Sequence, residues 1–492
     1  MQPLLALSPI ILTLVLILAL KRSPLVSCLG GIIAALVLAR LPVGFQLTGE
    51  GLLMALESSA YLALSVALVV LPGLFLTEVL KGQGVIDGIA SGISSIPLEP
   101  AAKMLILLLG VMPAVESLTG FGVSLFLSVP VLLRLFEPLM ARRLALLGMN
   151  IMPWGTLALA TIVGASLVNE RVAALGMVSA LTSAPVFPLL GFVALYTLGG
   201  WPTLRRWGGL ALLLGLGLPV LLYLAARYAS VETAGVAAGL GMAALAMVGL
   251  RLSGLAAVPD RTGPSLVRLF VPYLLVFALI VVTRVVPPLW NWLRSAGVLH
   301  NIRVTFAPLA SPGVCLLAVA LLLQALRPVK MDGKALLQRA SKPILATSAF
   351  LVLAQVMREA GMIESLARSM SNLDGVLLWV LVPAVGMTSG FATGSNVGGN
   401  VLLISLQHAV GANHGEALLY AAAHSSAAGH AVFAALPIIM LVMAIAGEGR
   451  GDTTSAVRDM LRFALGVAAI LLIGLVMSFS LLDSFHLVPK VL

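Results

Sequence analysis

Residues 388–400 read Thr-Ser-Gly-Phe-Ala-Thr-Gly-Ser-Asn-Val-Gly-Gly-Asn, and they interrupt the apolar region 374–410 with polar residues and glycines. A second interruption, Glu-Ser-Leu-Thr-Gly-Phe-Gly at 116–122, lies within the apolar region 101–133. Irregular backbone inside a membrane is tolerated only where protein or a water-filled cavity satisfies its polar groups. We therefore predict that each region is a re-entrant hairpin, which enters the membrane and returns to the side it left.

The two interrupted regions resemble each other. Residues 113–121 read Pro-Ala-Val-Glu-Ser-Leu-Thr-Gly-Phe, and residues 383–391 read Pro-Ala-Val-Gly-Met-Thr-Ser-Gly-Phe, so that five of nine positions match without a gap. The clustering of Lys and Arg between apolar stretches predicts that the first hairpin enters from the cytoplasm and the second from the periplasm. Similar segments in opposite orientation are typical of inverted-repeat transporters. We predict one transmembrane domain, 1–492, with a first repeat at about 1–200 and a second at about 266–492.

The composition around these hairpins is that of a membrane protein. Of the 492 residues, 60% are hydrophobic and only 10% are charged, and the mean hydropathy is +1.11. Apolar stretches of about 20 residues, the length that crosses a bilayer as a helix, recur along the chain. We predict an all-α polytopic protein of the bacterial inner membrane, with about 12 transmembrane helices besides the two hairpins.

The basic residues predict the orientation of the chain and exclude one class of partner. The net charge of +10 resides in connections between apolar stretches, and no basic stripe is interleaved with aromatic residues, so a nucleic-acid partner is not expected. Both termini are predicted to lie outside the cell. Arg284, Arg294 and Arg303 fall on the opposite side from the other basic residues and break the positive-inside rule locally. Cys28 and Cys315 are predicted to be small buried hydrophobes.

The second interruption favours an anion-binding site at membrane depth. A half-helix that starts near Ser395 would direct free N–H groups toward the turn, and this positive end suits a carboxylate. A glycine-rich contact between helices or a surface turn is the alternative. Asn150 precedes Pro153, at a kink that either opens the backbone for binding or only shapes packing. The predicted substrate-binding residues are Ser117, Thr119, Gly120, Asn150, Thr393, Gly394, Ser395, Asn396, Asn400 and Ser425.

Three ionisable side chains are predicted to couple transport to protons, namely Glu116, His424 and His430. An acidic group at membrane depth is costly unless it is paired or protonatable, and histidine titrates near neutral pH. The alternatives are a Glu116 bonded to the N–H groups of its own hairpin, and histidines that only pack. The histidines lie about 240° apart on a continuous helix and would share a face only if Gly429 broke it. No metal or other cofactor is expected, only a proton or a sodium ion as the coupling ion.

Residues 116–122, followed by an apolar half-helix and by Asn-Ile-Met-Pro at 150–153, resemble the first signature region of the L-lactate permease family. Residues 392–402, Ala-Thr-Gly-Ser-Asn-Val-Gly-Gly-Asn-Val-Leu, resemble its second signature, and a similar order extends over most of the chain, including the Gly-Glu-Gly loop at 447–449. The resemblance implies uptake of lactate and glycolate with protons. It also implies an ion-transporter-like fold, in which scaffold helices flank a transport core with two hairpins.

The span 417–445 departs from the family pattern. His424 stands where the family commonly has an Asn, Ala427 and Ala428 stand where it has glycines, and the span lacks the family's Lys. These departures predict a divergent member, to which the identity of the substrate does not transfer directly.

Together these features predict a secondary active transporter that carries a small monocarboxylate, such as lactate or glycolate, by proton symport with alternating access. A different organic anion, or coupling to sodium, is the alternative within this class. The expected partners are the small organic anion and the lipid bilayer. A homodimer is compatible with the sequence, which does not define the oligomeric state.

Two other classes of protein are less consistent with the sequence. An enzyme is not expected, because the chain lacks His-Glu-x-x-His, Gly-x-Ser-x-Gly and paired Asp motifs. A proton-translocating subunit of a membrane respiratory complex has a similar hydrophobicity. Such a subunit would place Lys and Glu in series at the middle of the membrane, whereas the lysines of this chain lie in connections or near span ends.

Overall fold

The computed structural model describes residues 2–120, 122–255, 266–370, 373–447 and 453–488, and these residues form mainly helices. Within them, eight helices are long and apolar enough to cross a membrane, or up to ten when each of two bent helix pairs is one span. The prediction of an all-α, multi-pass membrane protein is therefore confirmed. The predicted count of about 12 spans is not confirmed.

Several predicted spans are too short or too bent to count as single crossings. Helices α1 (Gln2–Leu18), α2 (Pro24–Leu38) and α15 (Pro312–Leu326) have 17, 15 and 15 residues, fewer than the about 20 that cross the hydrocarbon core. The predicted spans 144–168 and 417–445 are each divided, with bends of 61° and 42° at their breaks.

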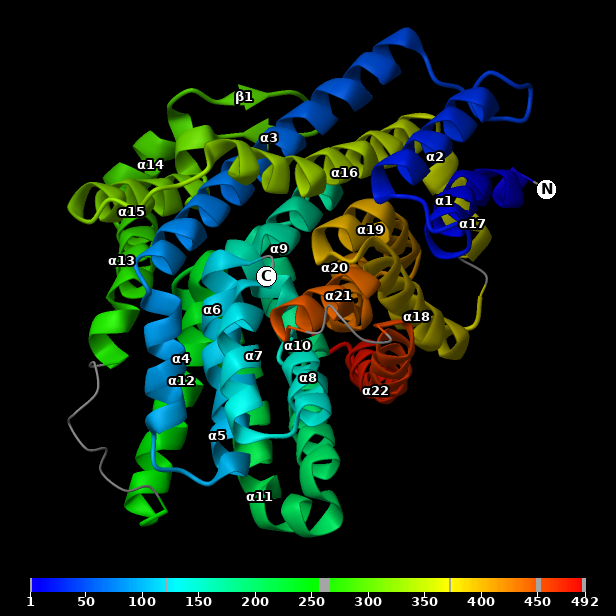
Figure 1. Ribbon diagram of the computed structural model, residues 1–492. Coiled ribbons are helices and arrows are strands. Elements are labelled where there is room, and N and C mark those ends of the chain that lie inside the picture. The colour runs from blue at the N-terminus through cyan, green and yellow to red at the C-terminus, as the bar shows by residue number, and fades with distance from the viewer. Residues whose placement is uncertain (1, 121, 256–265, 371–372, 448–452, 489–492) are drawn as a thin grey trace.

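The first half of the chain surrounds the first predicted hairpin. Its elements are α3 (Gly49–Gly82), α4 (Val85–Ser95), α5 (Pro100–Ile106), the π-helical turn η1 (Leu107–Val111), α6 (Met112–Thr119), α7 (Val123–Leu135), α8 (Pro138–Leu147), the 3-10 turn η2 (Met152–Trp154), α9 (Gly155–Val168), α10 (Val172–Thr182), α11 (Val186–Tyr228) and α12 (Val231–Leu252). Helices α5 to α8, α11 and α12 run together as one bundle below α3 (Figure 1). The first predicted hairpin therefore packs mainly against helices of its own half.

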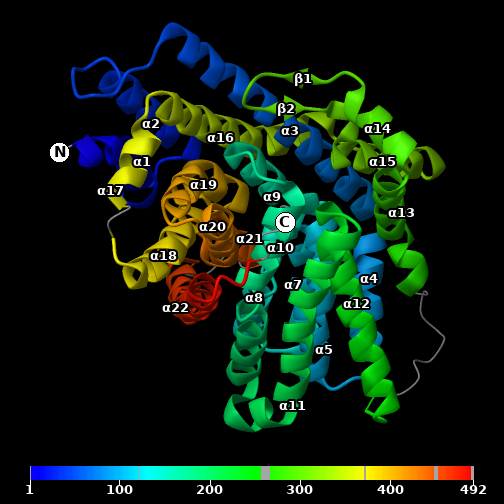
Figure 2. The ribbon, with the colours of Figure 1, turned by 180° about the vertical axis from the view of Figure 1, so that it is seen from behind.

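The second half places α16 along α3, and α18 to α22 gather beside the first bundle (Figure 2). Asp332 caps α16 by accepting hydrogen bonds from the N–H groups of Lys334 and Ala335 at 3.0 and 3.1 Å. The elements of this half, besides α15, are α13 (Leu266–Val285), α14 (Pro287–Ser295), β1 (Leu299–His300), β2 (Thr305–Phe306), the 3-10 turn η3 (Pro308–Ala310), α16 (Gly333–Glu359), α17 (Met362–Met370), α18 (Gly375–Thr393), α19 (Asn396–Asn413), α20 (Ala417–Ala431), the 3-10 turn η4 (Val432–Ala434), α21 (Leu436–Ile445) and α22 (Thr453–Ser484). The two short strands pair antiparallel.

The two halves contact each other reciprocally around their broken spans. Helix α19 packs on α9, and α21 packs on α7. Helix α20 contacts η2, the break of the first bent pair, whereas α8 contacts η4, the break of the second. This exchange of equivalent contacts is the arrangement that two repeats related by a two-fold axis would give.

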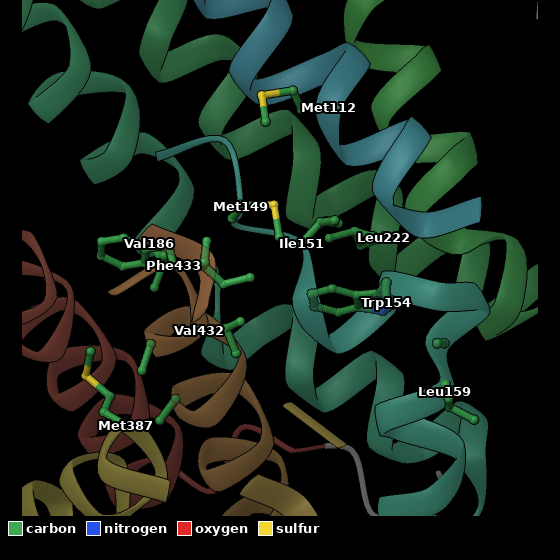
Figure 3. Packing of buried hydrophobic residues seen from close by; sticks show 14 of the residues in the cluster. Met112, Met149, Ile151, Trp154, Leu159, Val186, Leu222, Met387, Val432 and Phe433 are labelled. Carbon is green, nitrogen blue, oxygen red and sulfur yellow. The ribbon is translucent and has the colours of Figure 1, made fainter. Parts of the chain in front are cut away.

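Apolar side chains fill the space around the two breaks. Ile151 and Trp154 lie at the first break and Val432 and Phe433 at the second, and Figure 3 shows them among other buried hydrophobic residues. Each of these four side chains is at most 2% exposed. Polar groups at this depth therefore depend on one another, and on whatever binds there, for their hydrogen bonds.

Both hairpin turns begin where a helix ends at a Thr-Gly pair. Helix α6 ends at Thr119 and α18 ends at Thr393, and the glycines that follow, Gly120 and Gly394, have φ of +68° and +65°. Glycine adopts this region without steric cost, which explains why the helices stop there. Each threonine hydroxyl donates to the carbonyl four residues earlier, at 2.7 and 2.8 Å.

The structural register of the two turns differs from the sequence match. The match aligns Gly120 with Gly390, whereas the helix ends align Gly120 with Gly394. Gly390 instead lies inside α18, where a Cβ atom would collide with the Ala428 carbonyl oxygen of α20. Gly390 is thus a packing glycine and Gly120 a turn glycine. Phe121, which contributed to the match, lies outside the described residues.

Candidate functional site

The second turn starts α19 with a serine cap. Ser395 accepts a hydrogen bond from the Gly398 N–H at 3.4 Å, as the sequence predicted for a half-helix beginning here. The Thr393 hydroxyl, which lies within hydrogen-bond distance of the Ser389 carbonyl, lies equally close to the Ser395 carbonyl at 2.8 Å, so that its single proton serves one of the two at a time. The cap hydrogen bond is long and its acceptor is uncharged, so within the described residues this cap brings no negative charge to the positive end of α19.

Asn396 is the most conspicuous polar side chain of this turn. It is 4% exposed, and neither its amide nitrogen nor its amide oxygen has a hydrogen-bond partner in the part of the chain that the structure describes. A methyl group added at Gly429 of α20 would lie 2.9 Å from the Asn396 Nδ2 atom and 2.6 Å from Pro153 of η2. The amide therefore lies where the second turn, α20 and the first break meet.

Asn400 and His424 complete a polar cluster beside Asn396. The Asn400 Nδ2 atom donates to the Ala160 carbonyl of α9 and to the Ser425 hydroxyl, both at 3.0 Å. The His424 Nε2 atom lies 3.1 Å from the Gly399 carbonyl. Within the described ranges, the Asn400 Oδ1 and His424 Nδ1 atoms have no hydrogen-bond partner. Four of the predicted residues, Asn396, Asn400, His424 and Ser425, are thus buried on the facing elements α19 and α20.

The first turn is built differently, because it contains its own carboxylate. Glu116 is 1% exposed. Its carboxylate accepts hydrogen bonds from the Gly122 N–H at 3.0 Å, the Ser124 N–H at 3.2 Å and the Ser124 hydroxyl at 2.7 Å. These bonds cap the start of α7, which matches the alternative interpretation of Glu116 as a group bonded to its own hairpin.

Asn150 lies at the first break but bonds to backbone rather than to the second turn. Its Nδ2 atom donates to the carbonyls of Leu147 and Leu108 at 3.1 and 3.2 Å. Leu108 lies in the π-helical turn η1, five residues before Pro113, which has no N–H to return to it. Asn150 therefore donates to a carbonyl that the proline leaves without an N–H donor. The end of α8 at Leu147 confirms the predicted break at this position.

The two histidines of α20 face different neighbours. Helix α20 continues through Gly429 to Ala431, so the helix is not broken there. The histidines consequently do not share a face. The His430 Nε2 atom lies 2.9 Å from the Ser183 hydroxyl, and its ring also lies beside the backbone of Asn150. His430 therefore belongs with the first break, and His424 belongs with the second turn.

The remaining predicted residues lie apart from the α19–α20 cluster. Ser117 points toward α12, because a Cβ atom at Gly235 would collide with its hydroxyl oxygen. Gly120 faces Thr156, whose side chain occupies the place of the missing Cβ atom. Thr119 bonds within its own helix. The Gly-Glu-Gly loop cannot be placed beyond Gly447, since residues 448–449 lie outside the described residues.

Sequence reasoning missed two features near the breaks. Thr156, Leu157 and Ala158 have φ of +54°, +54° and +56°, a left-handed conformation that is unfavourable for residues with a Cβ atom. Ser426 bonds to the Thr182 hydroxyl at 2.6 Å across the two halves. The pair Ser425-Ser426 next to His424 was the available signal for the bond between Ser426 and Thr182. Nothing in the sequence indicates the left-handed turn at 156–158.

The chain combines several membrane-spanning helices with polar side chains buried at two broken spans, which is the architecture of a membrane transport protein. Residues 295–482 match the model of a protein family described as L-lactate permease. The chain is also 24% identical over 429 residues to an L-lactate permease of Streptococcus iniae, and the alignment covers 82% of this chain and 90% of that protein. Both similarities agree with the resemblance to the L-lactate permease family that the two signature regions predicted, and they point to a transporter rather than an enzyme.

Proposed function

We propose that this protein is a secondary active transporter that carries a small 2-hydroxy monocarboxylate, lactate or glycolate, across the bacterial inner membrane by proton symport. The observation that carries this proposal is the buried Asn396 amide, which has no partner among the described residues and lies at the uncharged cap of α19. The name of the Streptococcus iniae relative, L-lactate permease, supports lactate as the first substrate to test.

The cluster around Asn396 has the groups that a 2-hydroxy acid requires. A carboxylate needs hydrogen-bond donors, and the first N–H groups of α19 and the Asn396 Nδ2 atom are donors. Ser425 accepts from Asn400 and so keeps its own hydroxyl proton for the ligand. The substrate hydroxyl needs an acceptor, and the Oδ1 atoms of Asn396 and Asn400 have no partner within the described part of the chain.

His424 is the proton acceptor that we favour. A carbonyl oxygen only accepts, so the contact with Gly399 fixes the proton on the His424 Nε2 atom and leaves Nδ1 as an acceptor. That atom lies unpartnered among the described residues, beside the turn that would hold the anion. Protonation of His424 would offset the negative charge of the entering carboxylate. Glu116 and His430, the other predicted coupling groups, remain alternatives.

The two helix–turn–helix segments are proposed to be re-entrant hairpins of an inverted repeat. Their reciprocal contacts with the opposite broken spans support this arrangement. Alternating access then requires that α18 to α21, with the bound anion, move relative to the long helices α3 and α16. Irregular backbone at the turns permits such movement at a small number of residues.

A second candidate within the class is a sodium-coupled transporter of another organic anion. The unpartnered amide oxygens of Asn396 and Asn400, counted within the described ranges, would also suit a sodium ion. His424 stands where the family commonly has an Asn, and this titratable side chain favours a proton as the coupling ion.

Uptake of labelled L-lactate and glycolate into proteoliposomes, with an inward proton gradient and no sodium, tests the proposal. We expect accumulation that an uncoupler abolishes and that Asn396→Ala reduces by about tenfold or more. Asn413→Ala, at the other end of α19, is the matched control and should leave uptake unchanged. Uptake that persists in Asn396→Ala with an unaltered Michaelis constant would contradict the proposed site.

A further inference from the structure

A cavity of about 440 Å³ lies between α3, α9, α12, α13 and η3, and we name it the α9–α12 cavity. Its lining includes Ser166, Ser230, Glu232, Arg284, Trp290 and Ser311. Cavities of about 300 to 1,000 Å³ accommodate small ligands. We propose that this cavity is a second, outer binding site in which Arg284 receives a small carboxylate before the anion reaches the second turn. The inference rests on the proposed function as an anion transporter.

Helix α9 is a wall shared by the α9–α12 cavity and the cluster around Asn400. Ala160 and Gly164, four residues apart, face α19: the Ala160 carbonyl accepts from Asn400 at 3.0 Å, and a Cβ atom at Gly164 would lie 3.1 Å from the same Nδ2 atom. Leu159 and Ser166, on the other face of the helix, line the cavity. Only one helix therefore separates the two places, and that helix begins in the strained left-handed turn.

The Arg284 guanidinium is fixed by several contacts, but one of its nitrogens makes only a long hydrogen bond. Its side chain is 7% exposed, its Nε atom donates to Glu232 at 3.0 Å and its Nη2 atom to the Ala310 carbonyl at 2.7 Å. The ring of Trp290 lies 4.3 Å from the guanidinium carbon. The Nη1 atom makes only a 3.5 Å contact, with Thr283, among the described residues. A guanidinium fixed in this way binds a carboxylate with little further loss of entropy.

The cavity keeps an excess of positive charge although Arg284 and Glu232 pair with each other. Among the described residues, the charged ones that line it are Arg227, Arg284 and Glu232, which together carry one net positive charge. Arg284 is also one of the arginines that oppose the charge bias of the rest of the chain. The unbalanced charge is that of Arg227, and the pair of Arg284 and Glu232 lies beside an open space of the size of a small anion.

The direction in which single variants change the Michaelis constant distinguishes a docking site from a structural ion pair. Arg284→Gln should raise the Michaelis constant for L-lactate about tenfold with little change in maximal rate, and Arg284→Lys should lie between. Glu232→Gln removes a competing carboxylate and should lower the constant or leave it unchanged. The double variant Glu232→Gln/Arg284→Gln should stay impaired. Recovery in the double variant, with equal damage from each single change, would overturn the inference.

A labelling experiment tests the cavity independently of lactate transport. Ser166→Cys, with Ser65→Cys on the α3 wall as a second reporter, is treated in membranes with an anionic and a cationic methanethiosulfonate reagent of similar size. The buried Cys28 and Cys315 give little background. We expect the anionic reagent to react faster, and Arg284→Gln to abolish this preference. If the two reagents react at equal rates in the cysteine variants that retain Arg284, or if neither reporter is labelled, the docking site is wrong even if lactate is transported. A clear preference without lactate uptake would leave the cavity intact and reject only the substrate.

Discussion

The two turns of the molecule differ in the group that lies at the start of the following helix, which is a carboxylate at the first turn and a neutral side chain at the second. At the first turn, α7 begins with N–H groups that are already bound to a carboxylate, because Glu116 lies 3.0 Å from the Gly122 nitrogen and 2.7 Å from the Ser124 hydroxyl. At the second turn, α19 begins with a neutral serine cap at 3.4 Å and with an Asn396 amide that has no partner within the described residues. The first turn contains its anion, whereas the second is available for one.

Alignment of the two turns by their helix ends shows which residue of the second turn corresponds to Glu116. When Gly120 is aligned with Gly394, Glu116 falls opposite Gly390, which packs on the backbone of α20 and has no room for a side chain. The second turn therefore cannot hold an equivalent internal carboxylate. We infer that the substrate carboxylate occupies at α19 the place that Glu116 occupies at α7.

The largest effect is expected when the second turn is made to resemble the first. Asn396→Asp places a carboxylate at the start of α19, where it would repel the substrate and bind the free N–H groups itself. We predict that uptake of L-lactate falls about 100-fold while the protein stays folded. Asn413→Asp makes the same charge change at the far end of α19 and should have little effect on uptake. Equal loss in both variants would show that charge on α19, not its position, is responsible.

Removal of the favoured proton acceptor should uncouple transport without closing the site. For one proton per anion, a gradient of one pH unit sustains about tenfold accumulation, and His424→Gln should reduce this ratio to near one while facilitated exchange continues. His300→Gln, an exposed histidine in β1, is the control. Glu116→Gln in the same assay tests the first turn. Full accumulation in Glu116→Gln and none in His424→Gln would assign proton coupling to the second half.

Opening the first turn should affect stability more than transport. Glu116→Gln replaces an acceptor of three hydrogen bonds by a group that also presents donors to the same N–H groups. We expect a loss of about 2 kcal/mol in the free energy of unfolding, measured by thermal denaturation in detergent, with the Michaelis constant nearly unchanged. Glu137→Gln, at an exposed position before α8, should not alter stability. A raised Michaelis constant at normal stability would instead place substrate at the first turn.

The smallest effect is expected at the neutral cap. Ser395→Ala removes a 3.4 Å hydrogen bond to Gly398, and we expect it to cost about 0.5 kcal/mol of stability. If an anion supplies part of the capping in the wild type, saturating L-lactate should stabilise Ser395→Ala at least as much as the wild type. A thermal shift with lactate titration checks this, with Ser480→Ala on α22, whose hydroxyl bonds within its own helix, as the control. Loss of the lactate-induced shift in Ser395→Ala alone would mean that the serine, not the helix end, holds the ligand.

Much of this arrangement follows from local sequence. Apolar stretches predicted the helices, and the glycines and hydroxyl residues at 393–395 predicted a turn and the Ser395 cap, because these choices depend on neighbouring residues only. Asn150 before Pro153 likewise predicted the first break. The buried state of Cys28 and Cys315 was also predicted correctly.

The remaining features depend on contacts between distant residues. The bond between His430 and Ser183 joins positions 247 residues apart, and the role of Gly390 depends on α20, not on its neighbours in sequence. The match of Pro113 with Pro383 therefore gave the wrong register for the turns. The hairpins' passage through the membrane and the role of each predicted site residue stay predictions.

The central claim is that the substrate carboxylate binds at the second turn and not at the first. A cryo-electron-microscopy map of the protein with saturating L-lactate tests it most directly. We predict density for the anion at the start of α19, within hydrogen-bond distance of the Asn396 amide and the Ser425 hydroxyl, while Glu116 keeps its bonds to Gly122 and Ser124. Lactate density that displaces Glu116 at α7, with the Asn396 amide unoccupied, would contradict the account.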